Sequence, residues 1–330
     1  MWFRHPITLL PIVLAACLAP GQTPDGRPDA DGECTKVIPA GVGTLQTQLD
    51  ALRPGDVLCL RGGVYATGAR FGTAADRVTF GTSGKPEAYV SLTAYRDEQP
   101  VIRGQFRITG NYLKISKLRF EGPLNPDQAS PTARRDNLVE FRDNHHVIFL
   151  QNEVTKSDYH AGIYLARVNH VSITDCVIHH NGRFGLERDP KTGAKTINVD
   201  HGIYWGSTSG GGNIVANNRI YANRGYGLHI YPRAYDITVV GNRLFANGNS
   251  GIIIAGKSDR ITVSGNSSVL NESNPQIRVR SGHKNVIFGN QTWAKDEDLA
   301  GIQNWTLSDV RDNQIAEPDW QSFPELGNHK

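Results

Sequence analysis

Residues 218–241 read NRIYANRGYGLHIYPRAYDITVVG, followed by NRLFANGNSGIIIAGKSDRITVSG over 242–265 and NSSVLNESNPQIRVRSGHKNVIFG over 266–289. Each block is 24 residues long and begins with an asparagine, so one position recurs at Asn218, Asn242, Asn266 and Asn290. A β-branched apolar run precedes each asparagine, as at 237–239. A fixed period of roughly 20 to 50 residues indicates a solenoid in which every repeat forms one coil.

The repeat has the order strand, asparagine, strand, turn, glycine, strand, which fits one coil of a parallel β-helix. Glycine opens the third strand nine residues after the asparagine, at Gly227 and Gly251. Strands of successive coils would stack in parallel about 4.8 Å apart, and inward asparagines would form a hydrogen-bonded ladder. A β-propeller would need blades of about 40 to 50 residues, and an antiparallel sandwich would need hairpin turns that are not found.

The same step leads upstream from Asn152 to Cys176, which would occupy a ladder rung as a small apolar substitute. This position favours a buried structural thiol over a catalytic one. The ladder breaks once, because Cys176 and Asn218 are 42 residues apart, or 24 plus 18. The segment 202–205 copies the segment 162–165, so we place the insertion at about 183–200.

The composition describes a turn-rich β protein, with 35 glycines among 330 residues, 38% hydrophobic and 20% charged residues. A chain of this composition is not wholly disordered. A formal net charge of +3, without a basic run or an aromatic and basic motif, gives no support to nucleic-acid binding. We therefore expect no nucleic-acid partner, and we expect a monomer.

The N-terminus is typical of an exported protein. Arg4 precedes an apolar stretch at 7–16 that is too short to span a bilayer as a mature helix, which indicates a signal peptide over 1–16. Leu14-Ala15-Ala16-Cys17 resembles the bacterial lipobox, which implies lipidation of Cys17 and attachment to the membrane through that lipid alone. The alternative is an ordinary secretory signal that discards Cys17. Residues 17–33, rich in Pro, Gly and Asp, are expected to form a flexible linker.

Export predicts an extracytoplasmic cell-envelope location, and such a compartment is oxidising. Cys34 and Cys59 flank the first structured segment, so we expect a disulfide between them. Cys176 is left unpaired.

Residues 34–66 resemble the N-terminal cap of the pectate-lyase-like superfamily of right-handed parallel β-helices. A short amphipathic helix with Leu45, Leu49 and Leu52 is followed by the Pro-Gly-Asp turn at 54–56, a strand, and the Gly-Val-Tyr sequence at 63–65. Farther along, the segment 101–104 resembles the first full coil of those proteins, and 111–115 opens the next.

The resemblance covers about residues 34–315. It implies an all-β fold, with a capping helix, a right-handed parallel β-helix over 67–315 and a C-terminal tail at 316–330. Residues 124–136, rich in Pro, Asp and Arg, are expected to protrude as a loop. That superfamily contains lyases, hydrolases, epimerases and non-catalytic proteins, so the resemblance specifies the fold and leaves the chemistry open.

The resemblance also implies a substrate groove along the sheet of glycine-led strands. Strand alternation places Ile163 inside and Tyr164 outside, and the same parity predicts an outward set of Tyr164, Tyr204, His229, Tyr231, Ile253, Arg278, Arg280 and Gln303. His160 and His201 lie at turns that lead into two such strands, with His201 expected at the rim. Tyr204 and His229 are expected on neighbouring rungs, with Arg278 two rungs, about 10 Å, further. The insertion precedes a groove strand, where a lid would lie.

A face of Tyr, His and Arg suits an acidic polysaccharide. Arg278 or Arg280 would neutralise a carboxylate, His229 or His201 would serve as base, and Tyr204 would protonate the leaving oxygen in a β-elimination. Tyr164, Tyr231 and His160 would help to bind the sugar. This set predicts a lyase or an epimerase acting on C5.

Hydrolysis needs two carboxylates at a set separation. We expect none on the groove strands, and only the insertion offers Glu187, Asp189 and Asp200. The Asp-Pro-His-Asp motif of alginate epimerases is absent, as is the aspartate cluster of calcium-dependent pectate lyases. The sequence thus predicts no cofactor and no metal site, although it leaves Ca²⁺ open.

A second interpretation is a non-catalytic surface lipoprotein that binds glycan or a protein partner through the groove. Tyr164 and Tyr204 would then cover sheet surface as stacked aromatics, and Arg278 and Arg280 would form a solvated edge. His179 and His180 are expected to face solvent or to bond to the ladder.

Overall fold

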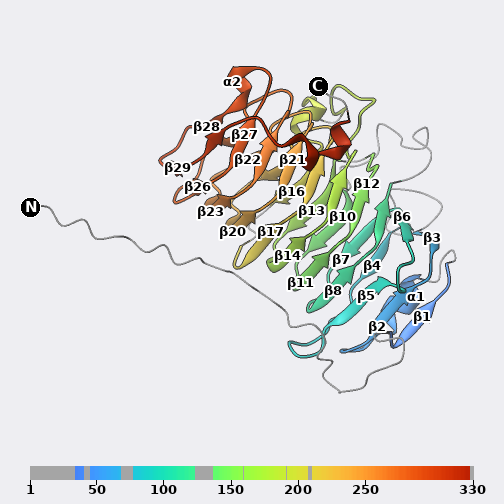
Figure 1. Cartoon of the computed structure of the whole chain (residues 1–330). Helices are drawn as coiled ribbons and strands as arrows, with labels where there is room; N and C mark the ends of the chain where they lie inside the picture. The colour runs from blue at the N-terminus through green and yellow to red at the C-terminus, as the bar shows by residue number, and fades with distance from the viewer. Residues whose placement is uncertain are drawn as a thin grey trace, which may run out of the picture. The chain divides into compact units, whose positions relative to one another are not determined.

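The computed structural model describes residues 34–40, 45–67, 77–122, 137–158, 160–190, 192–206 and 210–327. Within these ranges the strands stack in three parallel sheets that follow one another around each coil (Figure 1). The predicted all-β parallel β-helix is confirmed. The predicted signal peptide, Cys17, the linker and the loop at 124–136 lie outside the described residues. None of the described helices is both long and apolar enough to cross a membrane.

We name the sheets A, B and C. Sheet A consists of β1 (Lys36–Ile38), β2 (Val57–Leu60), β5 (Val90–Ala94), β8 (Leu113–Ser116), β11 (His145–Leu150), β14 (Asn169–Thr174), β17 (Asn213–Ala216), β20 (Tyr235–Val240), β23 (Asp259–Ser264), β26 (Val286–Phe288) and β29 (Asp309–Arg311). Sheet B consists of β3 (Gly63–Ala66), β6 (Pro100–Arg103), β9 (Arg119–Glu121), β12 (Glu153–Thr155), β15 (Val177–His179), β18 (Arg219–Tyr221), β21 (Arg243–Phe245), β24 (Ser267–Val269), β27 (Gln291–Trp293) and β30 (Gln314–Ile315).

Sheet C contains the predicted groove strands. It consists of β4 (Val78–Phe80), β7 (Phe106–Ile108), β10 (Asn137–Arg142), β13 (Ala161–Ala166), β16 (His201–Gly206), β19 (Leu228–Ile230), β22 (Ile252–Ile254), β25 (Ile277–Val279) and β28 (Ile302–Asn304). The described helices are short: α1 (Leu45–Asp50), α2 (Glu297–Ala300) and the 3₁₀ turns η3 (Thr196–Asn198), η4 (Trp320–Ser322) and η5 (Pro324–Leu326).

The core consists of rows of apolar side chains that are in register from coil to coil. On sheet C one inward row contains Ile163, Ile203, Leu228, Ile252 and Ile277, and all five are fully buried. Burying one such side chain stabilises a fold by about 1.5–3 kcal/mol. Because the strand period is 2, this row fixes which side chains between them face outward.

The predicted asparagine ladder lies inside the turn between sheets A and B. Asn242 is 1% exposed, and its side-chain amide donates to the carbonyl of Val215 and to Oδ1 of Asn266, both at 2.9 Å. Its own Oδ1 accepts the backbone N–H of Asn218 at 2.9 Å. The residue before each rung is left-handed, with φ of 56° at Asn217 and 66° at Gly241. Asn and Gly tolerate this conformation, which explains the repeated Gly-Asn pairs.

Cys176 replaces one rung of this ladder, as predicted. Its backbone N–H donates to Oδ1 of Asn218 at 2.9 Å, and its sulfur accepts the backbone N–H of Asn152 at 3.5 Å. The side chain is buried and makes no disulfide, and burial raises the pKa of its thiol to about 12.

A second ladder, between sheets B and C, was not anticipated. Asn181, Asn223, Asn247 and Asn271 are buried, and each amide donates to a carbonyl of the preceding coil, as from Asn247 to Ile220 at 3.0 Å. Neighbouring rungs also bond to each other, with Asn223 donating to Asn247 at 2.9 Å.

The N-terminal cap has the predicted helix and disulfide. Leu45 and Leu49 of α1 are buried, and they cover the first coil together with Leu52. Cys34 is bonded to Cys59 of β2. The disulfide thus ties the first described residue to sheet A.

The predicted insertion lies between β15 and β16, where the 24-residue period predicts it. Its first residue, Arg183, makes ion pairs with two buried carboxylates of the same segment, Asp200 at 2.6 Å and Asp189 at 3.1 Å. Arg224 and Asn249 of the next two coils bind η3, through Thr196 Oγ1 at 3.0 Å and the Ile197 carbonyl at 3.1 Å. The insertion is therefore fastened along the turns that lead into sheet C.

The C-terminal segment folds back onto the outer face of sheet B. The Phe323 ring contacts Phe245 at a centroid distance of 5.1 Å, and Trp320 contacts Trp293 at 5.3 Å. Glu325 forms an ion pair with Arg219. This segment shields an aromatic stripe that would otherwise face solvent.

Candidate functional site

The outward row of sheet C follows the predicted register. Tyr164 pairs with Tyr204, and Tyr204 with His229, so the last two lie on neighbouring rungs. Their rings stack with centroids 5.1 Å apart at 25°. Arg278 lies two rungs beyond His229, after Ile253. These placements confirm the parity prediction, although Ile253 is covered by neighbours and is 2% exposed.

His201 differs from its predicted position at the rim. It is the first residue of β16 and is 1% exposed. Its Nε2 lies 3.0 Å from Nδ1 of the partly buried His229. The reason is that Tyr226 lies on the next rung and, together with His229, packs against the ring at centroid distances of 5.3 and 4.7 Å.

His160 adds a third imidazole to this cluster. Its ring lies 5.8 Å from that of His201 and 5.3 Å from that of Tyr204, both edge-on. The predicted His160, His201, Tyr204 and His229 are therefore brought together on two adjoining coils and the turn before them.

His201 and His229, which we call the histidine pair, are uncharged. Burial lowers the pKa of His201 well below its ordinary value, and the neighbouring His229 and His160 lower it further. Burial also lowers the pKa of His229 to about 3, because an imidazolium loses more hydration energy than a neutral ring. Both rings stay neutral at physiological pH.

A cavity of about 660 Å³ opens beside the histidine pair. Its lining includes His229, Tyr226 and Tyr231 from one coil, Arg278 and Arg280 from another, and Asn198 from the insertion. The described residues that line it contain two permanent cations and no carboxylate. The cavity is therefore electrostatically suited to an anion.

Arg278 and Arg280 share one aromatic neighbour, Trp305. Their guanidinium groups lie 5.2 and 4.7 Å from its ring centroid, while the indole remains 52% exposed. Arg278 also donates from Nε to Gln303 at 3.1 Å. Burial lowers the pKa of Arg278, and its cation is thus held in a partly dehydrated position that favours pairing with an anion.

Tyr226 is a residue that the sequence analysis missed. It is 5% exposed, lines the cavity and contacts the ring of His229 at 5.0 Å. Burial raises the pKa of its hydroxyl, partly opposed by Arg278 and Arg280. The signal was present, because Tyr226 precedes Gly227 as His201 precedes Gly202.

The groove strands do carry a carboxylate, contrary to expectation. Glu140 on β10 pairs with Tyr164 in the outward row. It forms an ion pair with Arg107 at 2.6 Å and another with Arg142, whose guanidinium lies 5.7 Å from the Tyr164 ring centroid. The glycine-led pattern does not mark this strand, because no glycine opens it.

The carboxylates of the insertion are not placed for hydrolysis. Asp189 and Asp200 are buried against Arg183, and Glu187 is exposed. None of the three lines the cavity among the described residues. A pair of carboxylates across the cavity is thus missing from its described lining.

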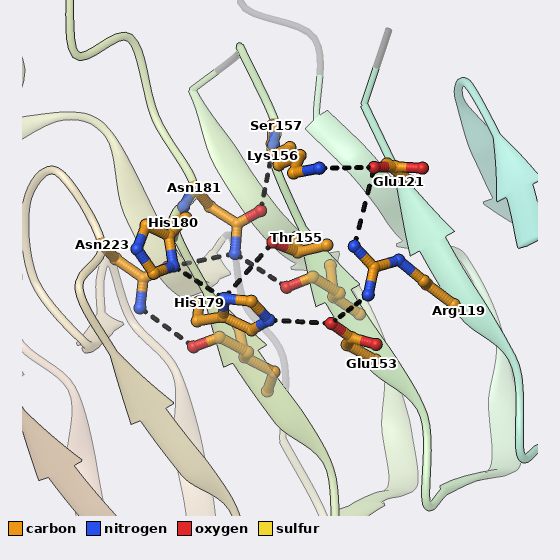
Figure 2. A network of polar contacts seen from close by, with 12 residues as sticks. Arg119, Glu121, Glu153, Thr155, Lys156, Ser157, His179, His180, Asn181 and Asn223 are labelled. Carbon is orange, nitrogen blue, oxygen red and sulfur yellow. Dashed lines mark hydrogen bonds and ion pairs between the residues drawn. The ribbon is translucent and has the colours of Figure 1, made fainter. Parts of the chain in front are cut away.

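A separate polar network covers the outer face of sheet B (Figure 2). Glu153 accepts from Arg119 at 2.7 Å and bonds Nε2 of His179 at 2.9 Å, and these partners lower its pKa, His179 first. Lys156 donates to Glu121 at 2.9 Å. The charged groups of this network are thus paired with one another. His179 bonds to a neighbouring carboxylate and does not face solvent.

Within the described ranges, no cluster of three or more His, Cys, Asp or Glu side chains is arranged to hold a metal ion. The ionisable side chains in the described lining of the cavity are Arg278, Arg280, Tyr226, Tyr231 and His229.

Comparisons with known proteins agree with this architecture. A rhamnogalacturonan lyase superposes with a TM-score of 0.59 at 13% identity, covering 87% of this chain and 89% of its own. Pectate lyase Pel9A gives 0.56 at 14%, covering 86% and 79%. An alginate lyase from Paenibacillus sp. str. FPU-7 gives 0.54 at 15%, covering 84% and 100%. At these identities the likeness concerns the fold alone, and no curated protein matches the sequence.

The family model of the right-handed β-helix region matches residues 107–315, well over half of the chain. It includes the coils that carry the asparagine ladders and every side chain named above for the cavity. The protein belongs to the right-handed β-helix family.

Proposed function

We propose that the outer face of sheet C binds an acidic polysaccharide and acts on it by β-elimination or by the related epimerisation at C5. The observation that carries this proposal is the cavity, which has two arginines and no carboxylate among its described lining residues and adjoins a neutral histidine pair. Both reactions need a cation to neutralise the uronate carboxylate and a group to exchange the C5 proton.

In this proposal Arg278 and Arg280 bind the carboxylate of the reacting sugar. The backbones of Arg278 and His229 are two rungs apart, about 10 Å along the helix, and the Arg278 side chain extends across part of this distance to bond the hydroxyl of Tyr226. Tyr231 and Trp305 offer exposed aromatic surface beside these cations, and such rings stack on sugar faces.

Towards the N-terminal coils, Tyr164 and Tyr204 continue the same face. Arg142 and Arg107 flank Glu140 there with a net charge of one positive unit, so this end also tolerates an anionic chain. The three structurally similar proteins are described as lyases of pectate, alginate and rhamnogalacturonan, and this adds general support for a polysaccharide substrate.

The test is to incubate the protein with a panel of uronic-acid polymers and to follow two products. Elimination forms a C4=C5 double bond that absorbs in the ultraviolet, and epimerisation in D₂O places deuterium at C5, which NMR detects. The variant Arg280→Ala is expected to lower the rate at least tenfold. Its side chain is exposed, so the fold should be unaffected.

The matched control is His170→Ala, an exposed change on sheet A. Binding without either product, lost in Arg280→Ala and retained in His170→Ala, would favour a non-catalytic glycan-binding protein. If no polymer binds or reacts, the proposal fails.

We also propose that the protein is an exported lipoprotein attached through Cys17. The disulfide of Cys34 and Cys59 supports an oxidising compartment. The variant Cys17→Ser is expected to move the protein from the membrane to the soluble fraction, measured by fractionation and blotting. Unchanged membrane association of the variant would contradict the lipid anchor.

A further inference from the structure

The histidine pair of the cavity has a defined direction of hydrogen bonding. The backbone N–H of Tyr226 points at Nδ1 of His201 from 3.4 Å, and Nε2 of His201 lies 3.0 Å from Nδ1 of His229. The first contact is long, but a backbone N–H can only donate. Nδ1 of His201 is therefore the lone-pair nitrogen, since a proton there would face another donor in a buried position.

Each neutral imidazole has a single N–H, so the direction propagates through the pair. With Nδ1 of His201 accepting, its proton is on Nε2, which donates to Nδ1 of His229. The proton of His229 is then on Nε2. This nitrogen makes no hydrogen bond to the part of the chain that the structure describes, and His229 lines the cavity. The cavity thus receives an N–H donor from His229 instead of a lone pair.

We propose that His201 is a positioning residue that holds His229 as the Nε2–H tautomer, and that His229 donates this hydrogen bond to the carboxylate of a bound uronate. The inference rests on the proposed function and changes the role predicted for both histidines, since neither offers a base to C5. His229 keeps its proton and stabilises the negative charge that gathers on the carboxylate, together with Arg278.

Exchange of the C5 proton is then left to a tyrosine beside His229, and this tyrosine must first give its own hydroxyl proton to solvent so that its phenolate can accept the proton from C5. Tyr204 contacts the His229 ring at 5.1 Å from the preceding rung and is assigned this role. Tyr226 contacts the same ring at 5.0 Å, but burial raises the pKa of its hydroxyl and so disfavours its phenolate. This division of roles places neutral N–H and guanidinium donors on the carboxylate and one tyrosine at the proton, and it needs neither an imidazolium nor a carboxylate in the described lining of the cavity.

The experiment is long-range ¹H–¹⁵N NMR of the full chain labelled with ¹⁵N-histidine, which distinguishes protonated from lone-pair ring nitrogens without any substrate. His229→Gln assigns the His229 signals by their loss. The expected result is a protonated Nε2 and a lone-pair Nδ1 at His229. A protonated Nδ1 in the wild type would overturn the proposal.

Two variants test whether His201 sets this state. His201→Gln retains an N–H donor near the position of Nε2 and should preserve the tautomer, whereas His201→Asn places no donor there and should give a mixture. On a uronan that reacts, His201→Gln should retain most of kcat and His201→Asn should lose at least tenfold, with KM little changed. A unique Nε2–H tautomer in His201→Asn would contradict the positioning role.

The experiments can contradict the proposed function and the positioning role of His201 independently of each other. If no uronan binds or reacts while the tautomer and its dependence on His201 are as expected, the proposed function fails and the positioning role stands. If turnover is found and His229 has its proton on Nδ1, the positioning role fails alone.

Discussion

At the scale of single residues, a buried asparagine completes the hydrogen bonding of each turn between sheets A and B. Asn242 bonds to the coil before it and to the coil after it. Replacement by leucine keeps a similar size and removes all these bonds. We expect Asn242→Leu to lower the free energy of unfolding by about 1–3 kcal/mol, because neighbouring buried amides lose their partners. Denaturant unfolding measures this.

The control for this change is Thr238→Leu, in the strand that precedes the same turn. Thr238 is exposed on sheet A, and its replacement should alter the free energy of unfolding by no more than about 0.5 kcal/mol. Equal effects of the two changes would mean that the ladder bonds add nothing specific.

Cys176 gives a second prediction at this scale. Burial raises the pKa of its thiol to about 12, so at pH 7 the thiolate that reacts with alkylating agents is almost absent. We expect mass mapping to find Cys176 unmodified after native treatment with iodoacetamide and fully modified after unfolding. Rapid native modification would place the thiol at the surface and contradict the ladder position.

The residues that the sequence predicted correctly are those fixed by the repeat. The period of 24 predicted the ladder at Asn218 to Asn290, the rung at Cys176, and the adjacency of Tyr204 and His229. It could not predict the burial of His201, because that depends on the size of Tyr226 on the next rung. Glu140 was missed because no glycine opens its strand, and Trp305 was missed because it lies one residue past the end of β28.

At the scale of elements, the insertion forms one wall of the cavity and is held in place by ion pairs. Arg183 donates to Asp200 through its backbone N–H at 2.8 Å and through its guanidinium at 2.9 and 2.6 Å. Asn198 of η3 then lines the cavity. The repeat arithmetic located this segment, but the ion pairs that hold it are specific to its own residues and have no counterpart in other coils.

Removing Arg183 leaves two buried carboxylates without their cation. We expect Arg183→Ala to destabilise the protein by about 3–5 kcal/mol, and Arg188→Ala, an exposed change in the same segment, to have little effect. Asp200→Asn should restore part of the stability of Arg183→Ala. Thermal unfolding of the three variants checks this, and equal melting temperatures for the two arginine variants would rule out an anchoring role.

The loss of stability in Arg183→Ala should depend on pH. Burial raises the pKa of Asp200, and Arg183 opposes that rise. Without Arg183 the folded protein therefore binds the carboxyl proton more tightly than the unfolded chain does, and stability falls as pH rises above the ordinary carboxyl pKa. The loss in Arg183→Ala should be larger at pH 7 than at a pH near 4. A loss independent of pH would show that Asp200 does not titrate differently in the two states.

At the scale of the whole molecule, nine rungs of sheet C form one continuous outer face. The resemblance to known β-helices predicted that such a face would be the functional one. What it could not supply was the distribution of charge along it. Ion pairs neutralise much of the face at Glu140, whereas Arg278 and Arg280 make no ion pair with the described residues and stand beside Trp305. Charge is therefore distributed unevenly along the face, because the cations that make no ion pair with the described residues lie in its last coils.

This uneven distribution of charge predicts how binding depends on substrate length. From Arg142 to Trp305 the face crosses the strands β10, β13, β16, β19, β22, β25 and β28, a distance of about 29 Å at the usual strand spacing, or roughly six sugar units. Affinity for uronic-acid oligomers, measured by calorimetry, should rise with length up to about six units and then level off. Arg280→Ala should weaken every length by a similar factor, because its site is the one that even the shortest oligomer would occupy. Arg142→Ala should weaken only oligomers long enough to reach it. Equal losses for short and long oligomers in Arg142→Ala would show that the chain does not run along sheet C.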